Sequence, residues 1–394
     1  MRNPNHSFLK CFWAVFYREC RRMCSRPIYF YCIIGAPLFC LIFFTSLMHQ
    51  GLPHDLPIGV VDLDNSSNSR TIIRTLDAMD LLKVEEVYHS QSEARDAVQR
   101  NKIYGFISIP SGFSASLQAF RRPTVTYYTS YALLVPGSLT YGAMRKAVEL
   151  VSGAAVRSQL LARGATENQA LGFIQPIVIE PHATFNPTLN YSIYLCNTLI
   201  PGVMMLLISL MTVYSIGSEV KFNTARYWLE KGNHSILLSL GAKELPYTLA
   251  FFAIGFFCDY YLYGVMKFPS NGGFLPMLFL TLCMVLAAQA LGIIFFSLIP
   301  TLRLALSMSC LWGVVSFSIC GFTFPEIAMN GPVQALSYLF PLRHYYLIYA
   351  SQTLDGNSMI YSWSSYMFLF IFILLPFIFM MRLKRELIHS FYIP

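Results

Sequence analysis

Residues 28–49 read IYFYCIIGAPLFCLIFFTSLMH, a run without a single Asp, Glu, Lys or Arg. As a helix, these residues would extend about 33 Å, which is enough to cross a hydrocarbon core of about 30 Å. Six basic side chains precede the run, and no small-residue cleavage site follows it. We therefore expect a retained membrane anchor and not a removed signal peptide.

Five further apolar runs are long enough to cross a bilayer. They are residues 193–217, 246–266, 274–299, 302–322 and 363–381. Of the 394 residues, 55% are apolar and only 12% are charged, and the mean hydropathy is +0.50, whereas soluble proteins carry about 25% charged residues. This composition excludes an ordinary soluble enzyme, a disordered chain and a disulfide-rich secreted module. It predicts an α-helical integral membrane protein with six transmembrane helices, the first at residues 28–49.

The distribution of basic residues predicts how these helices are oriented, because Lys and Arg collect on the cytoplasmic side. Fourteen Lys and Arg residues lie before the first span, in residues 218–245, at Arg303 and after the last span. The connections on the opposite side, apart from one long insertion, hold only Lys267 and Arg343. We expect both termini in the cytoplasm, with residues 383–394 as a cytoplasmic tail. The net charge of +8 then reflects membrane topology, and no nucleic-acid partner is expected.

The insertion, residues 50–192, has the composition of a water-soluble domain. It carries 12 basic and 12 acidic side chains and none of the ten cysteines. Strand patterns at 57–63, 82–88, 104–109, 124–129 and 177–179 alternate with helix patterns at 64–79, 92–101, 110–120, 137–163 and 167–174. This alternation favours parallel strands with helical crossovers. We expect an extracytoplasmic α/β domain between the first and second spans.

Two patterns in this insertion suggest binding sites but have simpler interpretations. Asp62 and Asp64 stand among serines and could form a carboxylate pair, yet Asp, Asn and Ser also favour strand ends and helix caps. A helical stripe in residues 137–163 is formed by Met144, Val148, Val151 and Ala155. We interpret the first pattern as cap chemistry and the second as a packing stripe rather than a ligand groove.

The chain lacks the motifs of common catalytic and metal sites. It contains no nucleophile elbow, no His-Glu metal pair and no glycine-rich phosphate loop such as GxxxxGK[ST]. Cys20 and Cys24 lie one helical turn apart, but no His or further Cys completes a four-ligand set. We predict no catalytic residue, no metal and no bound cofactor, so any ATP must be hydrolysed by another chain.

A series of short motifs runs along almost the whole chain. In order they are FYRE at 16–19, RP at 26–27, LPIGVVDLDNSS at 56–67, GFISIP at 105–110, NP at 186–187, IPG at 200–202, GAK at 241–243, FPE at 324–326 and YLFPL at 338–342. Their order resembles the permease subunits of type-2 ATP-binding-cassette (ABC) exporters, in particular the drug and macromolecule exporter branch, which has a large extracytoplasmic domain. Residues 219–224 depart from the common Glu-x-Glu-x-Gly-Thr pattern of this family because they read EVKFNT.

The resemblance implies a role for each remaining segment. Residues 1–27 correspond to a cytoplasmic amphipathic helix and residues 218–245 to the segment that couples the permease to its ATPase. Residues 323–345 correspond to an outer re-entrant hairpin that includes Phe324, Pro325, Glu326 and Pro341. The implied partners are an ABC ATPase that binds ATP and Mg, a second permease copy or paralogue, the inner-membrane lipid bilayer and a periplasmic adaptor.

Within the coupling segment, three aromatic and three charged residues are candidate ATPase contacts. They are Glu219, Phe222, Arg226, Tyr227, Trp228 and Glu230. The aromatic side chains would fill a groove on the ATPase, as buried aromatic anchors do in other interfaces, and the charged ones would pair around the rim. Alternatively, the segment lies flat on the membrane surface, where Trp and Tyr are also favoured.

Candidate substrate contacts lie within the spans themselves. Asp259 is the one acidic residue inside a predicted span, and such a residue usually faces a cavity or a partner; it is also close enough to the outer interface to be hydrated. Met204, Met205 and Met211 suit an adaptable apolar pathway, although such side chains equally face lipid or core.

These observations together predict an exporter permease that moves an amphipathic, lipid-like or drug-like substrate outward. A membrane-embedded transferase or polymerase acting at the outer membrane face is the alternative, and it would depend on Asp259, His344, Arg343 and Glu326. A receptor would explain the large insertion, but the segments before the first span and after the last one hold no output module.

Overall fold

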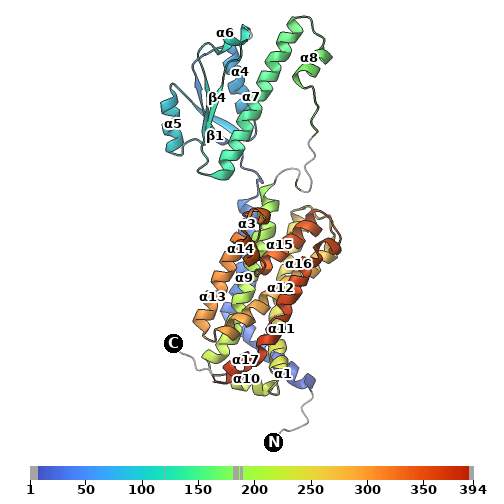
Figure 1. The fold of residues 1–394 in the computed structure, drawn as a ribbon. Helices are drawn as coiled ribbons and strands as arrows, with labels where there is room; N and C mark the ends of the chain where they lie inside the picture. The colour runs from blue at the N-terminus through green and yellow to red at the C-terminus, as the bar shows by residue number, and fades with distance from the viewer. Residues whose placement is uncertain (1–7, 120, 181–185, 187–189, 390–394) are drawn as a thin grey trace. The chain divides into compact units, whose positions relative to one another are not determined.

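The computed structural model describes residues 8–119, 121–180, 186 and 190–389. Two units make up the chain, one of residues 1–51 and 183–394 and the other of residues 52–182 (Figure 1). Each unit is considered by itself below. The first contains the apolar helices, and the second contains the β-sheet.

Six helical segments among the described residues are long and apolar enough to cross a membrane, in agreement with the six predicted spans. In chain order they are α2, η1 and α3 (Pro27–Leu47), α9 (Tyr191–Lys221), α11 with η2 (Ile236–Val265), α12 (Phe274–Leu298), α13 (Leu302–Ile319), and η5, α16 and α17 (Met359–His389). Each begins and ends within a few residues of the predicted span, except that α9, α11 and α17 continue as helices beyond the apolar run. Those extensions carry charged residues at one end of the bundle.

Helices α9 and α12 lie at the centre of this unit. α9 packs against α3, α12 and α13, and α12 also packs against α11, α16 and α17. Close approach of membrane helices depends on small residues at the crossing. At the crossing of α9 and α12, a Cβ atom added to Gly292 would lie 2.7 Å from the Ser209 carbonyl oxygen and 2.7 Å from Thr212 Cβ. The absence of a side chain at Gly292 therefore sets the distance between the two helices.

Gly292→Ala is expected to lower the thermal stability of the purified protein, because the added methyl group would press against backbone that cannot move aside. Overpacking of this kind costs about 1–3 kcal/mol. The matched control is Gly241→Ala in α11, where an added Cβ meets no atom within 4 Å. Equal melting temperatures for the two variants would contradict the close crossing.

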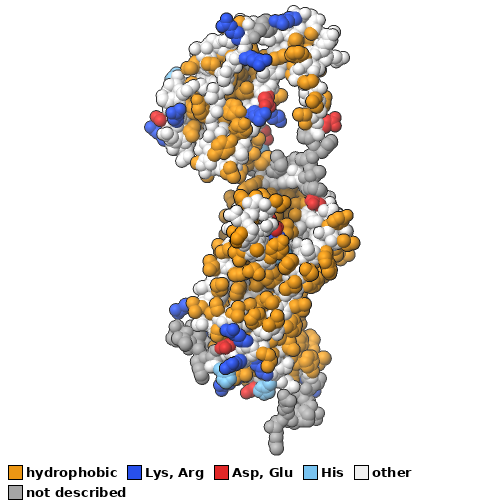
Figure 2. Space-filling view, in the orientation of Figure 1, with side chains coloured by type: hydrophobic (Ala, Val, Ile, Leu, Met, Phe, Trp, Pro, Cys, Tyr) orange, Lys and Arg blue, Asp and Glu red, His pale blue; other side chains and the backbone are white. Residues whose placement is uncertain are grey.

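Charged residues gather at one end of the helical unit, around α1 (Phe8–Ser25), α10 (Ala225–Lys231) and the end of α17 (Figure 2). These three elements come from distant parts of the sequence, and α10 contacts both α1 and α17. The middle of the bundle shows an almost wholly apolar surface in the same view. Residues 8–25 of the predicted N-terminal helix form α1, in which Cys11, Val15 and Glu19 are buried and Trp13 and Tyr17 are exposed.

The second unit is built on a four-stranded sheet with the order β2-β1-β3-β4. The strands are β1 (Leu56–Asp62), β2 (Leu82–Tyr88), β3 (Gly105–Ile109) and β4 (Thr126–Thr129). β1 pairs in parallel with both β2 and β3, as predicted. β4 pairs antiparallel with β3, which corrects the expectation of a wholly parallel sheet. An antiparallel edge strand is common on such sheets, and the strand pattern alone carries no direction.

Five helices accompany this sheet. They are α4 (Ser67–Asp77), α5 (Gln91–Gln99), α6 (Phe113–Gln118), α7 (Leu134–Ala162) and α8 (Glu167–Ile174). The N-cap of α5 is Ser90, whose hydroxyl accepts a hydrogen bond from Glu93 N. The helix therefore begins at Gln91 and not at Ser92, where the sequence pattern placed its start. Residues 177–179 form no strand, because their apolar side chains are about three-quarters exposed and no strand of this unit pairs with them.

The carboxylates that follow β1 act as local caps. Asp62 accepts hydrogen bonds from the Asp64 and Asn65 backbone N–H groups, each at 3.0 Å, and Asp64 accepts one from Ser114 N at 3.0 Å. The hydrogen bond with the Ser66 hydroxyl and those with the backbone N–H groups at the start of α6 lower the pKa of Asp64. This agrees with the cap interpretation, because both carboxylates accept hydrogen bonds from nearby backbone N–H groups.

Candidate functional site

The predicted coupling segment, residues 218–245, forms the charged end of the bundle. It comprises the last turn of α9, the short helix α10 and the start of α11, joined by turns at Asn223 and at residues 232–235. Asn223, Asn233 and His234 adopt positive φ values between 55° and 57°. Such a conformation suits Asn at a turn. The turns fold α10 back so that it packs on α9 and α11.

A network of buried charges joins this segment to α1, and we call it the ion cluster. Its members are Arg18, Glu19, Arg22, Glu219 and Lys243, with Glu19, Glu219 and Lys243 fully buried. Lys243 Nζ lies 2.9 Å from Glu219 Oε1 and 2.9 Å from Glu19 Oε2. The lysine from α11 therefore bridges a carboxylate on α9 and a carboxylate on α1.

The two arginines of α1 complete the ion cluster from the opposite side. Both guanidinium groups hydrogen-bond to Glu219, and Arg22 also donates to Ser218 Oγ at 2.7 Å. Although burial opposes its charge, the attraction of Glu219 and other nearby anionic groups raises the pKa of Arg22. Three cations thus face two carboxylates in a water-poor environment, where breaking such a network is costly.

Next to the ion cluster, Glu244 belongs to a second buried polar group. Its carboxylate accepts hydrogen bonds from Ser215 Oγ at 2.9 Å and Thr212 Oγ1 at 3.3 Å, and Gln289 Nε2 from α12 lies 3.4 Å away. Thr248 donates to Gln289 Oε1 at 2.8 Å. The contacts link α9, α11 and α12, so polar bonds continue from the charged end into the bundle.

Trp228 lies inside the protein and not on its surface. The side chain is fully buried, its Nε1 donates to the Ser239 carbonyl oxygen at 3.2 Å, and Lys243 Nζ lies 4.9 Å from the ring centroid. This corrects the interpretation of Trp228 as one of three aromatic groups that an ATPase would contact. The indole instead anchors α10 to α11 and covers the ion cluster.

The other aromatic candidates are exposed. Phe222 has 48% and Tyr227 has 52% of its surface exposed, and cations lie over both rings, with Arg26 at 4.6 Å from the Phe222 centroid and Lys231 at 4.7 Å from that of Tyr227. Arg226 and Glu230 are exposed beside them. We call Phe222, Arg226, Tyr227 and Glu230 the α10 surface.

The predicted outer hairpin contains η3 (Glu326–Ala328), α14 (Gly331–Ser337) and α15 (Pro341–Tyr349). Glu326 pairs with buried Arg343, whose guanidinium lies 3.8 Å from the Tyr338 ring centroid, and a ring nitrogen of His344 lies 3.0 Å from the Tyr338 carbonyl oxygen. Pro341 opens α15, whereas Phe324 and Pro325 are exposed. Three of the four polar residues of the transferase alternative, Glu326, Arg343 and His344, are therefore engaged in holding the hairpin.

The candidate pathway residues are buried inside the chain. Asp259 accepts a hydrogen bond from Thr281 Oγ1 at 2.6 Å and, with Met204, lines a cavity of about 10 Å³. Only 7% of the Asp259 surface is exposed within this unit. Met211 is also buried, and the cavity is the size of a single water molecule.

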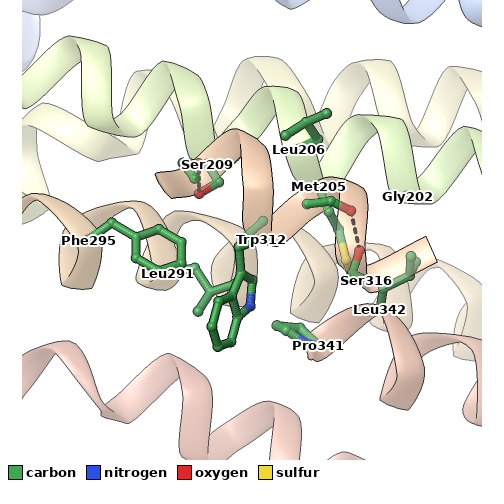
Figure 3. A pocket seen from close by; sticks show the side chains of 13 residues that line it. Gly202, Met205, Leu206, Ser209, Leu291, Phe295, Trp312, Ser316, Pro341 and Leu342 are labelled. Carbon is green, nitrogen blue, oxygen red and sulfur yellow. Dashed lines mark hydrogen bonds between the residues drawn. The ribbon is translucent and has the colours of Figure 1, made fainter. Parts of the chain in front are cut away.

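A second small cavity lies between α9, α12, α13 and α15 and measures about 30 Å³ (Figure 3). Met205 projects into it from α9, and the Trp312 indole projects into it from α13 opposite Leu291 and Pro341. Trp312 Nε1 has no hydrogen-bond partner among the described residues. Both cavities are too small for a transported molecule, and Met204, Met205 and Met211 are all buried within this unit.

The ion cluster includes residues that the sequence did not single out. Glu19 was visible as the one acid in the basic N-terminal segment, and Lys243 as a cation next to an apolar run. Their partners lie far apart in sequence, so nothing in the local pattern pairs them. Glu219 was expected at the rim of a docking site, and the structure places it at the centre of the ion cluster.

Comparison with known proteins places this arrangement in a family. No curated protein sequence matches the chain. A sequence model described as ABC-2 family transporter protein matches residues 28–382, a range that contains all but the start and end of the described helical unit and the whole of residues 52–182. The chain therefore belongs to the ABC-2 transporter family.

Proposed function

We propose that the chain is the permease subunit of an exporter that moves an amphipathic, lipid-like or drug-like substrate outward, driven by ATP hydrolysis on a separate subunit. Membership of the ABC-2 family implies an ABC ATPase as partner in general terms. The observation that supports this role is the exposed α10 surface directly over the buried ion cluster. A partner that moves α10 would act at once on three helices.

The α10 surface has the composition of a docking site. Two aromatic side chains stand exposed, flanked by Arg226 and Glu230, and aromatic and Arg residues carry much of the energy of protein interfaces. Arg226 also donates to the Ile388 carbonyl oxygen at 3.3 Å, which ties the surface to α17. We assign ATP and Mg binding to the partner ATPase that docks here.

Movement of α10 would be transmitted through Trp228 and Lys243. Trp228 fixes α10 to Ser239 of α11, and Lys243 of α11 is bonded to α9 and α1 through Glu219 and Glu19. In this proposal, ATP binding draws α10 inward and tilts α9 and α11 together. The ion cluster holds α1, α9 and α11 together during that movement.

The proposed topology places the α10 surface and both termini in the cytoplasm and residues 50–192 outside the inner membrane. The charge distribution supports this orientation, because Lys and Arg gather at the end of the bundle formed by α1, α10 and α17 (Figure 2). A two-fold pair of permeases, from a second copy or a paralogue, would form the conduit between chains. The extracytoplasmic domain would then meet a periplasmic adaptor.

The docking proposal is tested by purifying the protein from its native membrane in a mild detergent and identifying the co-purifying ATPase by mass spectrometry. Phe222→Ala with Tyr227→Ala is expected to reduce the captured ATPase by at least about tenfold, because aromatic interface anchors contribute about 2 kcal/mol or more each. Membrane insertion and melting temperature should stay close to those of the parent chain, since both side chains are half exposed.

Tyr361→Ala is the matched control, because Tyr361 is 78% exposed and lies before α16, far from α10 in sequence. It should capture as much ATPase as the parent chain. Unchanged capture by the Phe222/Tyr227 variant would show that these rings rest on the membrane surface. Capture of no ATPase by the parent chain would remove the exporter proposal altogether.

A further inference from the structure

In the unit of residues 52–182, α4 and α7 pack side by side on the sheet (Figure 1). Residues of these two helices and of α6 line a broad groove. It lies between the second half of α7, helix α6 and the segment 121–125 that leads into β4, and it measures about 830 Å³. Sites for small molecules generally measure about 300–1,000 Å³. The groove is therefore large enough for a molecule of lipid or drug size.

The floor and walls of the groove are apolar. Ile72 and Phe113 form buried parts of its lining, and the α7 side chains Val148, Val151 and Ala155 form one wall. Met144 of the same stripe is fully buried against the sheet. Val148 and Val151 also pack against this core, which agrees with the interpretation of the stripe as packing. The same two side chains and Ala155 line the groove as well, which that interpretation did not foresee.

Two cations stand at one side of this apolar surface. Arg121 and Arg122 are exposed and line the groove, and none of its described lining residues is acidic. Neither guanidinium has an ion-pair partner among the described residues. Both side chains line the groove and are exposed, so both charges are available to a ligand that enters it.

Several other polar side chains of the lining are already engaged in hydrogen bonds. Asn68 Nδ2 donates to Ser114 Oγ at 2.7 Å, Thr71 Oγ1 to the Ser67 carbonyl oxygen at 3.0 Å, and Gln159 Nε2 to the Leu117 carbonyl oxygen at 3.0 Å. The start of α6 is capped by Asp64. Strong donors to an anion therefore come from the two arginines, whose planar groups suit carboxylates and phosphates.

We propose that this groove binds an amphiphile with one apolar chain and an anionic head group, either a carboxylate or a phosphate. The chain of the ligand lies against Phe113, Val151 and Ala155, and its head group pairs with Arg121 and Arg122. Binding here is a property of residues 52–182. The further interpretation, that an exported amphiphile binds in this groove during its export, rests on the proposed function above.

Photo-crosslinking on the full-length protein tests this proposal. The protein is placed in nanodiscs of zwitterionic phosphatidylcholine, exposed to a diazirine-labelled palmitate or to a diazirine-labelled lysophosphatidic acid, and irradiated. Labelled peptides are then mapped by mass spectrometry. We expect labels within residues 113–125 and 148–159, and the more strongly labelling probe identifies the head group as carboxylate or phosphate.

Two kinds of variant separate the head-group contact from the apolar contact. Arg121→Ser with Arg122→Ser should lower labelling of these peptides by about tenfold, as loss of charge-assisted bonds predicts, and Arg121→Lys with Arg122→Lys should retain part of it. Ala155→Trp should abolish labelling by filling the groove. Arg95→Ser with Arg100→Ser, which removes two exposed arginines of α5 outside the groove, should have no effect.

Equal labelling of the parent chain and the Arg121/Arg122 and Ala155 variants would overturn the proposal, as would labels confined to the membrane-spanning helices. Protection from trypsin establishes that each variant is folded before it is compared. ATPase capture is measured on the same samples. Failure of capture with intact groove labelling would contradict the proposed function alone, whereas intact capture without groove labelling would contradict the ligand site alone.

Discussion

Lys243→Met is expected to destabilise the protein by about 3–5 kcal/mol, the cost of leaving buried charges without their partner. In the parent chain the ammonium group lies 2.9 Å from carboxylate oxygens of both Glu19 and Glu219. Glu219 keeps Arg18 and Arg22 after the substitution, but Glu19 keeps only an Arg18 nitrogen at 3.7 Å. The expected loss is measured as a lower midpoint in thermal unfolding of the detergent-purified protein.

A second substitution shows whether the loss has this electrostatic cause. Adding Glu19→Gln to Lys243→Met removes the carboxylate that was left unpaired, so part of the stability should return. Lys146→Met, on the exposed side of α7, serves as the control for loss of a lysine. If Lys243→Met melts like the Lys146 variant, or if Glu19→Gln brings no recovery, the ion cluster does not stabilise the bundle.

Trp228→Ala is expected to destabilise the protein to a similar extent, because truncating a buried aromatic side chain costs about 3–5 kcal/mol. The indole is fully buried and also holds α10 to α11 through its bond to the Ser239 carbonyl oxygen. Thermal unfolding is again the measurement. Trp228→Phe keeps most of the volume and loses the N–H donor, so its melting temperature should lie between those of the parent chain and the alanine variant.

The same variant distinguishes a structural role of Trp228 from a role in binding the ATPase. At a temperature well below its midpoint, Trp228→Ala should still capture ATPase in proportion to its folded fraction, whereas the Phe222/Tyr227 variant should be folded and capture little. Trp363→Ala provides the comparison for loss of an exposed indole, since Trp363 is 66% exposed. If Trp228→Ala melts at the same temperature as the parent chain but captures no ATPase, Trp228 contacts the ATPase and does not act as a buried anchor.

Much of the fold could be predicted because a physical constraint such as the thickness of a bilayer acts on one contiguous run of residues. A helix must have about 20 apolar residues to cross a bilayer, so the six spans followed directly from the sequence. In the 52–182 unit, β2 and α8 lie where the strand and helix patterns placed them. The direction of β4 and the unpaired state of residues 177–179 depended on neighbouring strands, about which a local pattern says nothing.

The candidate site was harder to predict because its contacts join distant residues. Residues 219 and 228 lie close together in sequence and have the same polar-aromatic surroundings as Phe222 and Tyr227, yet Glu219 and Trp228 are buried and the other two are exposed. What decides this is the packing of α1 and α11 on α10. The same holds for α7, where one helical stripe serves for packing at Met144 and lines a groove at Ala155.

The ion cluster also has a consequence for biosynthesis. Arg18, Glu19 and Arg22 leave the ribosome long before Lys243, and the entire 52–182 unit is made in the interval. Until α9 and α11 are inserted, the charges of α1 lack their partners, and burying them would cost several kcal/mol. We therefore expect α1 of the nascent chain to stay in contact with water. Lys243 then supplies the missing partner, so α1 of an unfinished chain is expected to be more accessible to proteases than α1 of the finished chain.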